Sequence, residues 1–204
     1  MDLLSFIRKK KAKKLILGII GEVNAGKTTL ANRIGRDFAG RELGTASPVP
    51  HETRTVCSLE NCEFKSNGSN LDMTVLDTPG ITTTVNYETF LNHGLTRREA
   101  IERAKEATKG VVEAIKTLDT IDAAVLVVDA IQQPFNQVNW TILGNLLARD
   151  IPVIVAANKQ DLNGAEDGLK LIKEAFSENP VVPISALRGN NMDKLYGEIA
   201  NSAA

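Results

Sequence analysis

A short glycine-containing segment near the N-terminus constrains the fold of this chain more than any other feature. It stands between residues 15–20, an apolar run with three isoleucines, and residues 27–36, which have a helical pattern. Its pattern is G-x-x-x-x-G-K-[ST], in which the glycines let a loop wrap around an anion that the backbone N–H groups and the helix N-terminus then face. We therefore predict a phosphate-binding loop. Its residues are Gly21, Glu22, Val23, Asn24, Ala25, Gly26, Lys27 and Thr28, followed by Thr29.

The rest of the chain predicts an α/β fold around this loop. Continuous apolar runs are typical of strands that are buried on both faces of a parallel sheet. Such strands are predicted at residues 15–20, 123–128, 151–157 and 181–184. Helical patterns alternate with them, which favours right-handed crossovers. The helices are predicted at residues 27–36, 97–118, 135–149, 165–177 and 191–201.

Two local signals refine this picture. The polar turn sequence at residues 66–70 separates predicted strands at 55–64 and 71–76, which predicts an antiparallel hairpin at the edge of the sheet. Thr96 and Glu99 have the spacing of a capping box at the start of the long helix. We expect a mostly parallel sheet with one antiparallel edge strand and helices on both faces.

The composition excludes several classes of protein. With 204 residues, of which 43% are hydrophobic and 24% charged, the chain has the size and composition of one ordinary globular domain. Its apolar runs are much shorter than the roughly 20 residues of a membrane span. Two cysteines, Cys57 and Cys62, are too few for a disulfide scaffold. This favours a reducing compartment, and we expect a cytoplasmic protein.

The basic residues are distributed unevenly along the chain. Residues 1–14 hold six of the 24 basic residues and one of the 25 acidic ones, a net charge of +5, which leaves residues 15–204 with a net charge of −6. We therefore expect a basic extension over residues 1–14 and a single domain over residues 15–204. The extension is the expected place for any attachment to RNA, to the ribosome or to an anionic membrane surface.

A second motif, DTPG at residues 77–80, follows the predicted strand at residues 71–76. An acidic side chain at the carboxyl end of such a strand lies where open α/β sheets bind ligands. We expect Asp77 to hold Mg²⁺ through a water molecule, with the hydroxyl of Thr28 as a direct ligand. The N–H of Gly80 is expected to face a γ-phosphate.

A third motif, NKQD at residues 158–161, predicts which base is bound. A fixed carboxylate at Asp161 can accept from two adjacent donors of guanine, N1–H and the 2-amino group, and adenine has no such pair. A site built for this match rejects the wrong base strongly. We expect Asn158 to tie this loop to the phosphate loop, and the stem of Lys159 to lie on the base. The backbone N–H groups expected to face guanine O6 belong to Ser185, Ala186 and Leu187.

In this order, the segments GEVNAGKT, DTPG, NKQD and SAL resemble the motifs of translation-factor-class GTPases, and GxxNxGK[ST] is similar to the loop of the TrmE-Era group. The resemblance spans nearly the whole chain after residue 14 and implies a P-loop NTPase fold, with GTP as substrate and GDP as product. Era carries an RNA-binding KH domain that we do not expect in this chain. Residues 50–54 resemble an Era-like switch I, which makes Thr53 the expected magnesium ligand there, with Thr55 and Thr45 as rivals.

The resemblance also bears on catalysis, for which the expected residues are Lys27, Thr53, Gly80 and Asn24. Ile81 follows the DTPG motif, and an aliphatic side chain cannot orient water, so intrinsic hydrolysis is expected to be slow. In several TrmE-Era proteins the equivalent of Asn24 helps to hold a potassium ion beside the phosphates. Asn24 is therefore either a potassium ligand or a residue that shapes the loop.

Two functions fit these observations. The first is a GTP-hydrolysing switch that docks on a ribosome or RNA. The second is a nucleotide-gated interaction module, at a membrane or in a G-domain dimer, in which slow turnover acts as a timer. The expected ligands are GTP or GDP with Mg²⁺, and potassium if Asn24 binds it. Residues 81–96 are expected to form a long switch II without an assigned partner.

Overall fold

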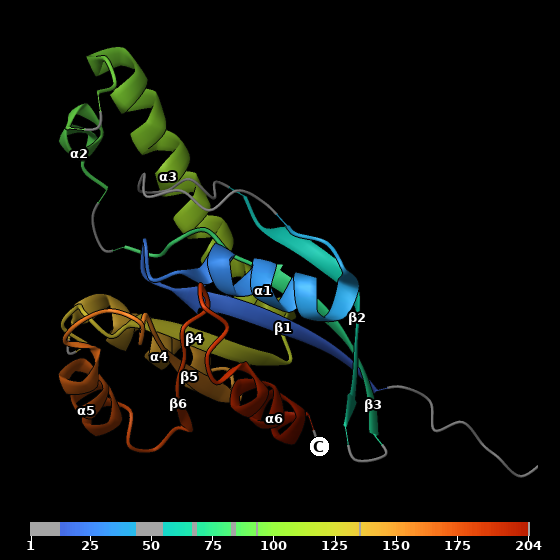
Figure 1. The fold of residues 1–204 in the computed structure, drawn as a ribbon. Coiled ribbons are helices and arrows are strands. Elements are labelled where there is room, and N and C mark those ends of the chain that lie inside the picture. Colours follow the sequence, from blue (N-terminus) through green and yellow to red (C-terminus); the bar gives the residue numbers. More distant parts are fainter. Residues whose placement is uncertain are drawn as a thin grey trace, which may run out of the picture.

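The first strand, β1 (Lys13–Gly21), shows why the sheet is covered on both faces. Because successive side chains of a strand point to opposite faces, its odd-numbered residues such as Leu17 and Ile19 enter one core, and even-numbered Ile20 enters another. The computed structural model describes residues 13–43, 55–66, 69–82, 85–92, 94–134 and 136–203. Within them, the chain forms one sheet between two layers of helices (Figure 1).

Six strands form this sheet in the order β2-β3-β1-β4-β5-β6. All neighbouring strands are parallel except β2 and β3, which are antiparallel and place β2 at the edge. The predicted mostly parallel sheet with one antiparallel edge strand is therefore confirmed. The remaining strands are β2 (Cys57–Ser66), β3 (Ser69–Asp77), β4 (Ala123–Asp129), β5 (Val153–Asn158) and β6 (Val181–Pro183).

The helices divide between the two faces of the sheet. Side chains from α1 and α6 pack in the core that includes Leu17, and side chains from α3, α4 and α5 pack in the core that includes Ile20. The 3₁₀ turn η1 (Leu118–Thr120) follows α3. The helices are α1 (Lys27–Ala39), α2 (Tyr87–Leu91), α3 (Arg97–Thr117), α4 (Gln137–Leu147), α5 (Ala165–Ala175) and α6 (Met192–Ser202).

Several element boundaries differ from the sequence prediction by one to three residues, and three differences have a clear physical reason. Strand β1 begins at Lys13, two residues earlier than expected, because Lys13 and Lys14 pair with β3. The hairpin is tighter than predicted, since the strands extend to Ser66 and from Ser69. Helix α2 was not predicted, because five residues offer no helical periodicity, and its start is fixed locally by an Asn86 cap.

The long helix α3 has two environments. Its start carries the predicted capping box, in which Thr96 and Glu99 bond each other's backbone N–H groups. Its first half packs on α2 through a small cluster around Phe90 and Ala100, and its second half packs on the sheet. Figure 1 shows α2 and the beginning of α3 standing away from the sheet. No helix of the described ranges is long and apolar enough to cross a membrane.

Candidate nucleotide site

The predicted motifs meet at one edge of the sheet. Strands β1, β3 and β5 are parallel to one another in the same sheet, so their carboxyl ends lie together. Residues 22–28 follow β1, Asp77 closes β3, and Asn158 closes β5. The structure therefore assembles three motifs that are far apart in sequence at the place where open α/β sheets bind ligands.

The phosphate loop has the backbone that its glycines predict. Asn24 and Gly26 both have positive φ angles, 63° and 99°, and α1 begins immediately after Gly26. The Nζ of Lys27 donates to the carbonyl oxygen of Glu22 at 2.6 Å. Burial lowers the pKa of Lys27 to about 8, against the opposing effect of the Asp77 and Glu22 carboxylates. Lys27 is thus a buried cation at the mouth of an anion-binding loop.

Thr28 and Asp77 form a site that suits a magnesium ion. The Thr28 hydroxyl donates to Oδ2 of Asp77 at 2.7 Å, and Oδ1 of Asp77 is buried without a hydrogen-bond partner in the described structure. Burial raises the pKa of Asp77, which the Thr28 bond and the charge of Lys27 oppose. Hydroxyl and carboxylate oxygens are the ligands that Mg²⁺ prefers, so this pair fits the ion that a nucleoside triphosphate carries.

The DTPG motif lies directly against the phosphate loop. A Cβ atom on Gly80 would stand only 2.7 Å from Cγ2 and 2.8 Å from Cα of Val23, so a residue without a side chain is needed there. Next to it, the N–H of Ile81 donates to the carbonyl of Gly21 at 3.1 Å, and the Ile81 side chain is buried. The side chain after the motif thus points into the core.

Asn158 connects the phosphate loop to the loop that follows β6. Its Nδ2 donates to the Ala25 carbonyl at 2.9 Å, and its Oδ1 accepts from the Ala186 N–H at 3.0 Å. A Cβ atom on Gly26 would stand 2.3 Å from that Nδ2, so the second glycine of the loop also makes room for this bridge. The bond to Ala25 is the expected tie between the NKQD loop and the phosphate loop, and the bond from Ala186 was not predicted.

We call residues 185–189 the base loop. The Ser185 hydroxyl donates to Oδ1 of Asp161 at 2.6 Å and accepts the N–H of Arg188 at 3.0 Å, which fixes the orientation of an otherwise exposed carboxylate. Lys159 has a positive φ of 68° and pairs with Asp129 at 2.6 Å. Asp161 and Lys159, which are expected to recognise a base, are therefore each held by a partner within the protein.

The three N–H groups of the predicted SAL contact differ from one another. Ser185 donates to the Asn190 carbonyl at 3.3 Å, and Ala186 donates to Asn158. Leu187 is 64% exposed, and its N–H has no acceptor among the described residues. Of these three N–H groups, that of Leu187 is therefore the one without an acceptor within the described ranges.

Some site residues lie elsewhere or were not predicted. Thr53 and its rival Thr45 lie outside the described residues, and the other rival, Thr55, is exposed. Sequence reasoning missed Asp129, the partner of Lys159, although it stands at the carboxyl end of a buried strand. It also missed two residues that lie outside the phosphate loop and the base loop but donate hydrogen bonds to them. These are Asn136, which donates to the Glu22 carboxylate at 3.0 Å, and Arg33, which donates to two carbonyls of the base loop.

The comparison with protein families decides what this geometry represents. Residues 16–159, which include the phosphate loop, the DTPG motif and the start of NKQD, match the family described as 50S ribosome-binding GTPase. The chain belongs to this family. It is 30% identical over 188 residues to GTPase Era from Geotalea daltonii, covering 88% of this chain and 52% of that protein. It is 27% identical to GTPase Era from Rickettsia bellii, covering 96% and 57%.

Solved structures support the same assignment for this family member. A crystal structure of Era with MgGDPNP and nucleotides 1506–1542 of 16S ribosomal RNA superimposes with a TM-score of 0.71 at 27% identity, covering 94% of this chain and 57% of that one. The chain is therefore similar to an Era G domain, with the P-loop GTPase fold. It spans little more than half the length of these Era proteins.

Proposed function

We propose that this chain binds GTP with Mg²⁺ and hydrolyses it to GDP and phosphate. The observation that carries the proposal is the Asn158 bridge, which holds the base-reading loop and the phosphate loop together through bonds of 2.9 and 3.0 Å. A nucleotide has a base and phosphates joined in one molecule, so it is the ligand that two loops held together in this way would bind. The Asp161 carboxylate, oriented by Ser185, gives the preference for guanine.

In this proposal, the residues around the phosphate loop divide the binding of the phosphates and of Mg²⁺ among them. Lys27 faces the terminal phosphates, and Thr28 and Asp77 hold Mg²⁺, which neutralises charge on the β- and γ-phosphate oxygens when bound. The Gly80 N–H donates to the γ-phosphate, whose loss on hydrolysis releases this segment. Thr53 completes the magnesium site from switch I. Glu22, Val23, Ala25 and Thr29 contribute backbone and hydroxyl donors around the phosphates.

The direct test is phosphate release from GTP and from ATP under identical Mg²⁺ concentrations. We expect phosphate release from GTP but not from ATP. The background is the phosphate release measured with the Lys27→Ala variant. Equal turnover of both nucleotides would contradict the guanine assignment, and no release from GTP in single-turnover conditions would contradict hydrolysis.

Catalysis in this proposal uses Asn24 rather than the residue after DTPG, because Ile81 is buried. Asn24 lies exposed in the phosphate loop with a positive φ, where its amide oxygen can share a potassium ion with phosphate oxygens. We expect hydrolysis to be severalfold faster in potassium than in sodium at equal ionic strength, and Asn24→Ala to remove the difference. Identical wild-type rates in both salts would leave Asn24 as a residue that only shapes the loop.

We propose that the switch acts on the ribosome or on another RNA. The family description and the relative crystallised with 16S ribosomal RNA support this partner. The exposed face of α3 supports it from this chain itself. Arg98, Lys105, Lys109 and Lys116 are exposed, and at 3.6 residues per turn they lie within about 40° of arc along about 27 Å of helix.

The acidic neighbours of this row leave most of its charge available. Lys105 pairs with Glu102 at 2.8 Å, but the other three cations form no ion pair within the described part of the chain. Glu113 accepts the N–H of Val56, the residue that precedes β2, at 3.4 Å. A row of cations at this spacing suits a phosphate backbone, which is bound mainly through charge.

Sedimentation of the full chain with ribosomes, in GDP and in GDPNP, tests this partner. We expect nucleotide-dependent pelleting that weakens in Lys105→Gln/Lys109→Gln/Lys116→Gln, with a salt dependence shallower by about two to three units of slope. Lys170→Gln/Lys173→Gln on α5 is the matched control. Binding to anionic vesicles instead of ribosomes, or nucleotide-dependent dimerisation without ribosome binding, would favour the alternative interaction module.

A further inference from the structure

Arg33 of α1 bonds carbonyl groups of the base loop, whose Ala186 N–H is bonded by Asn158. Its Nε donates to the Ala186 carbonyl at 3.3 Å, and its Nη2 donates to the Leu187 carbonyl at 3.0 Å. Gly189, with a φ of 80°, closes the loop beside the guanidinium, where a Cβ atom would lie 3.1 Å from Cζ of Arg33. Two bonds from one rigid fork therefore connect the helix after the phosphate loop to the loop that reads the base.

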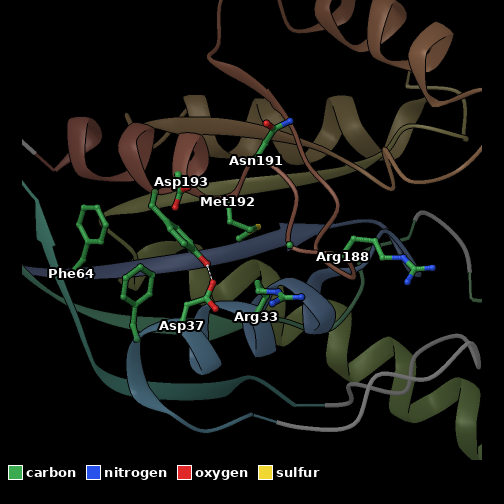
Figure 2. Close-up of a pocket in the computed structure, with 10 residues that line it drawn as sticks. Arg33, Asp37, Phe64, Arg188, Asn191, Met192 and Asp193 are labelled. Carbon is green, nitrogen blue, oxygen red and sulfur yellow. Dashed lines mark hydrogen bonds between the residues drawn. The ribbon is translucent and has the colours of Figure 1, made fainter.

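Packing supports the start of the base loop, where Ser185 and Ala186 are buried, but not its tip. Leu187 is exposed, and a hollow of about 450 Å³ lies beside Arg33, lined also by Asp37, Arg188 and Tyr196. Figure 2 shows Arg33 between Asp37 and Arg188 along this hollow. The position of the loop tip consequently depends on its hydrogen bonds.

Asp37 is the natural competitor for Arg33. It lies four residues later on the same helix, and arginine and aspartate at this spacing commonly pair. Instead, Oδ2 of Asp37 accepts the hydroxyl of Tyr196 at 2.6 Å, the dashed contact in Figure 2, and Arg33 forms no ion pair with any described residue. The Tyr196 ring is fixed by edge contacts with Phe38, 4.7 Å between centroids.

We propose that Arg33 is a positioning residue for guanine, and that Tyr196 keeps it in this role by holding Asp37 away. Arg33 acts through the loop: a shift of the Ala186 and Leu187 carbonyls moves Ser185, whose hydroxyl orients the Asp161 carboxylate. This inference rests on the proposed guanine site. It adds that base selection depends on a cation of α1 more than 150 residues away in sequence.

The first experiment measures release of fluorescent GDP and the ratio of GDP to IDP affinity, because IDP lacks the 2-amino group that Asp161 accepts. We expect Arg33→Met to speed GDP release about three- to tenfold and to reduce the ratio, with Arg33→Lys in between. Arg36→Met is the matched control. It removes a cation from the same helix, but its pair with Glu42 at 3.1 Å is exposed, so neither quantity should change.

The second experiment tests the competition. Tyr196→Phe keeps the ring but frees Asp37, so it should speed GDP release toward the Arg33→Met rate. Adding Asp37→Ala removes the competitor and should restore slow release. If the double variant releases GDP as fast as Tyr196→Phe, the effect of Tyr196 is not exerted through Asp37, and that part of the proposal is wrong.

The outcomes separate this inference from the proposed function. A wild-type chain that does not distinguish GDP from IDP and ADP contradicts the guanine site itself. A wild-type chain that prefers GDP, with an Arg33→Met variant that keeps both its release rate and its ratio, contradicts only the role of Arg33. Thermal melting of each ligand-free variant shows whether a change in release merely follows a loss of stability.

Discussion

The two ends of the nucleotide site are built differently. At the base end, Asn158 uses both ends of its amide, and Asp161 is bonded to Ser185, all within the protein. At the phosphate end, Lys27 is buried with one backbone carbonyl as its acceptor, and Oδ1 of Asp77 has no partner among the described residues. Since a buried charge without a full set of partners is costly, the phosphate end gains most when a ligand arrives.

This contrast teaches where affinity and selectivity reside. The base end is held in shape by its own hydrogen bonds, so it can discriminate between bases without first rearranging. The phosphate end holds charges that an anion and a metal ion would satisfy, so it should supply most of the binding free energy. Changes at the phosphate end should therefore weaken all nucleotides, and changes at the base end should alter which nucleotide is preferred.

The largest expected effect is that of Lys27→Ala. Removing the buried cation takes away its attraction for several phosphate charges, and we expect GTP affinity to fall by at least about a hundredfold. Calorimetric titration measures this, with Lys173→Ala, an exposed lysine of α5, as the control. Near-normal GTP affinity in Lys27→Ala would show that the phosphate end does not dominate binding.

The next effect belongs to the base end. Asp161→Asn should weaken GTP binding by roughly ten- to a hundredfold and should favour xanthosine triphosphate, whose 2-carbonyl can accept from an amide N–H. Competition between the two nucleotides measures the change in preference, and the wild-type chain is the control. If both nucleotides weakened equally, Asp161 would not read the base, and the contrast between the two ends would be lost.

A smaller effect should distinguish the metal site within the phosphate end. In Thr28→Ala the hydroxyl that bonds Asp77 is missing, so we expect the Mg²⁺ concentration needed for half-maximal GTP binding to rise about tenfold. Thr28→Ser restores the hydroxyl and should restore the dependence. An unchanged magnesium requirement in Thr28→Ala would contradict the assignment of this threonine.

The sequence predicted the features that depend on local patterns, but not those that depend on contacts between distant residues. The phosphate loop, the order of strands and helices, and the Thr96 capping box are encoded in short contiguous patterns, and each is present in the structure. The bond of Asn158 to the phosphate loop could also be predicted, because its motif implies a partner there. Such elements need only local spacing and the rule that parallel strands end at one edge.

Other features left no signal of this kind. The bonds of Arg33 join residues more than 150 positions apart, and a lone cation on a helix has many possible partners. Helix α2 is too short for a hydrophobic period, and it forms because the Asn86 side chain caps it and Phe90 is buried against α3. Tertiary packing fixes these features, so a pattern within one segment could not predict them.

The smallest expected effect concerns the charge state of Lys27. Because burial lowers its pKa to about 8, part of the ligand-free protein has a neutral lysine above that pH, whereas phosphate favours the charged form. Binding must then take up a proton, and GTP affinity should fall about fourfold between pH 7 and pH 8.5 while staying level below pH 7. Calorimetry at pH 8.5 in buffers of different ionisation enthalpy measures the proton uptake directly, and the same titration at pH 6.5 should show none from this group. Equal heats in all buffers at pH 8.5 would mean that Lys27 is already charged in the free protein, and that the phosphate end is as well prepared for its ligand as the base end.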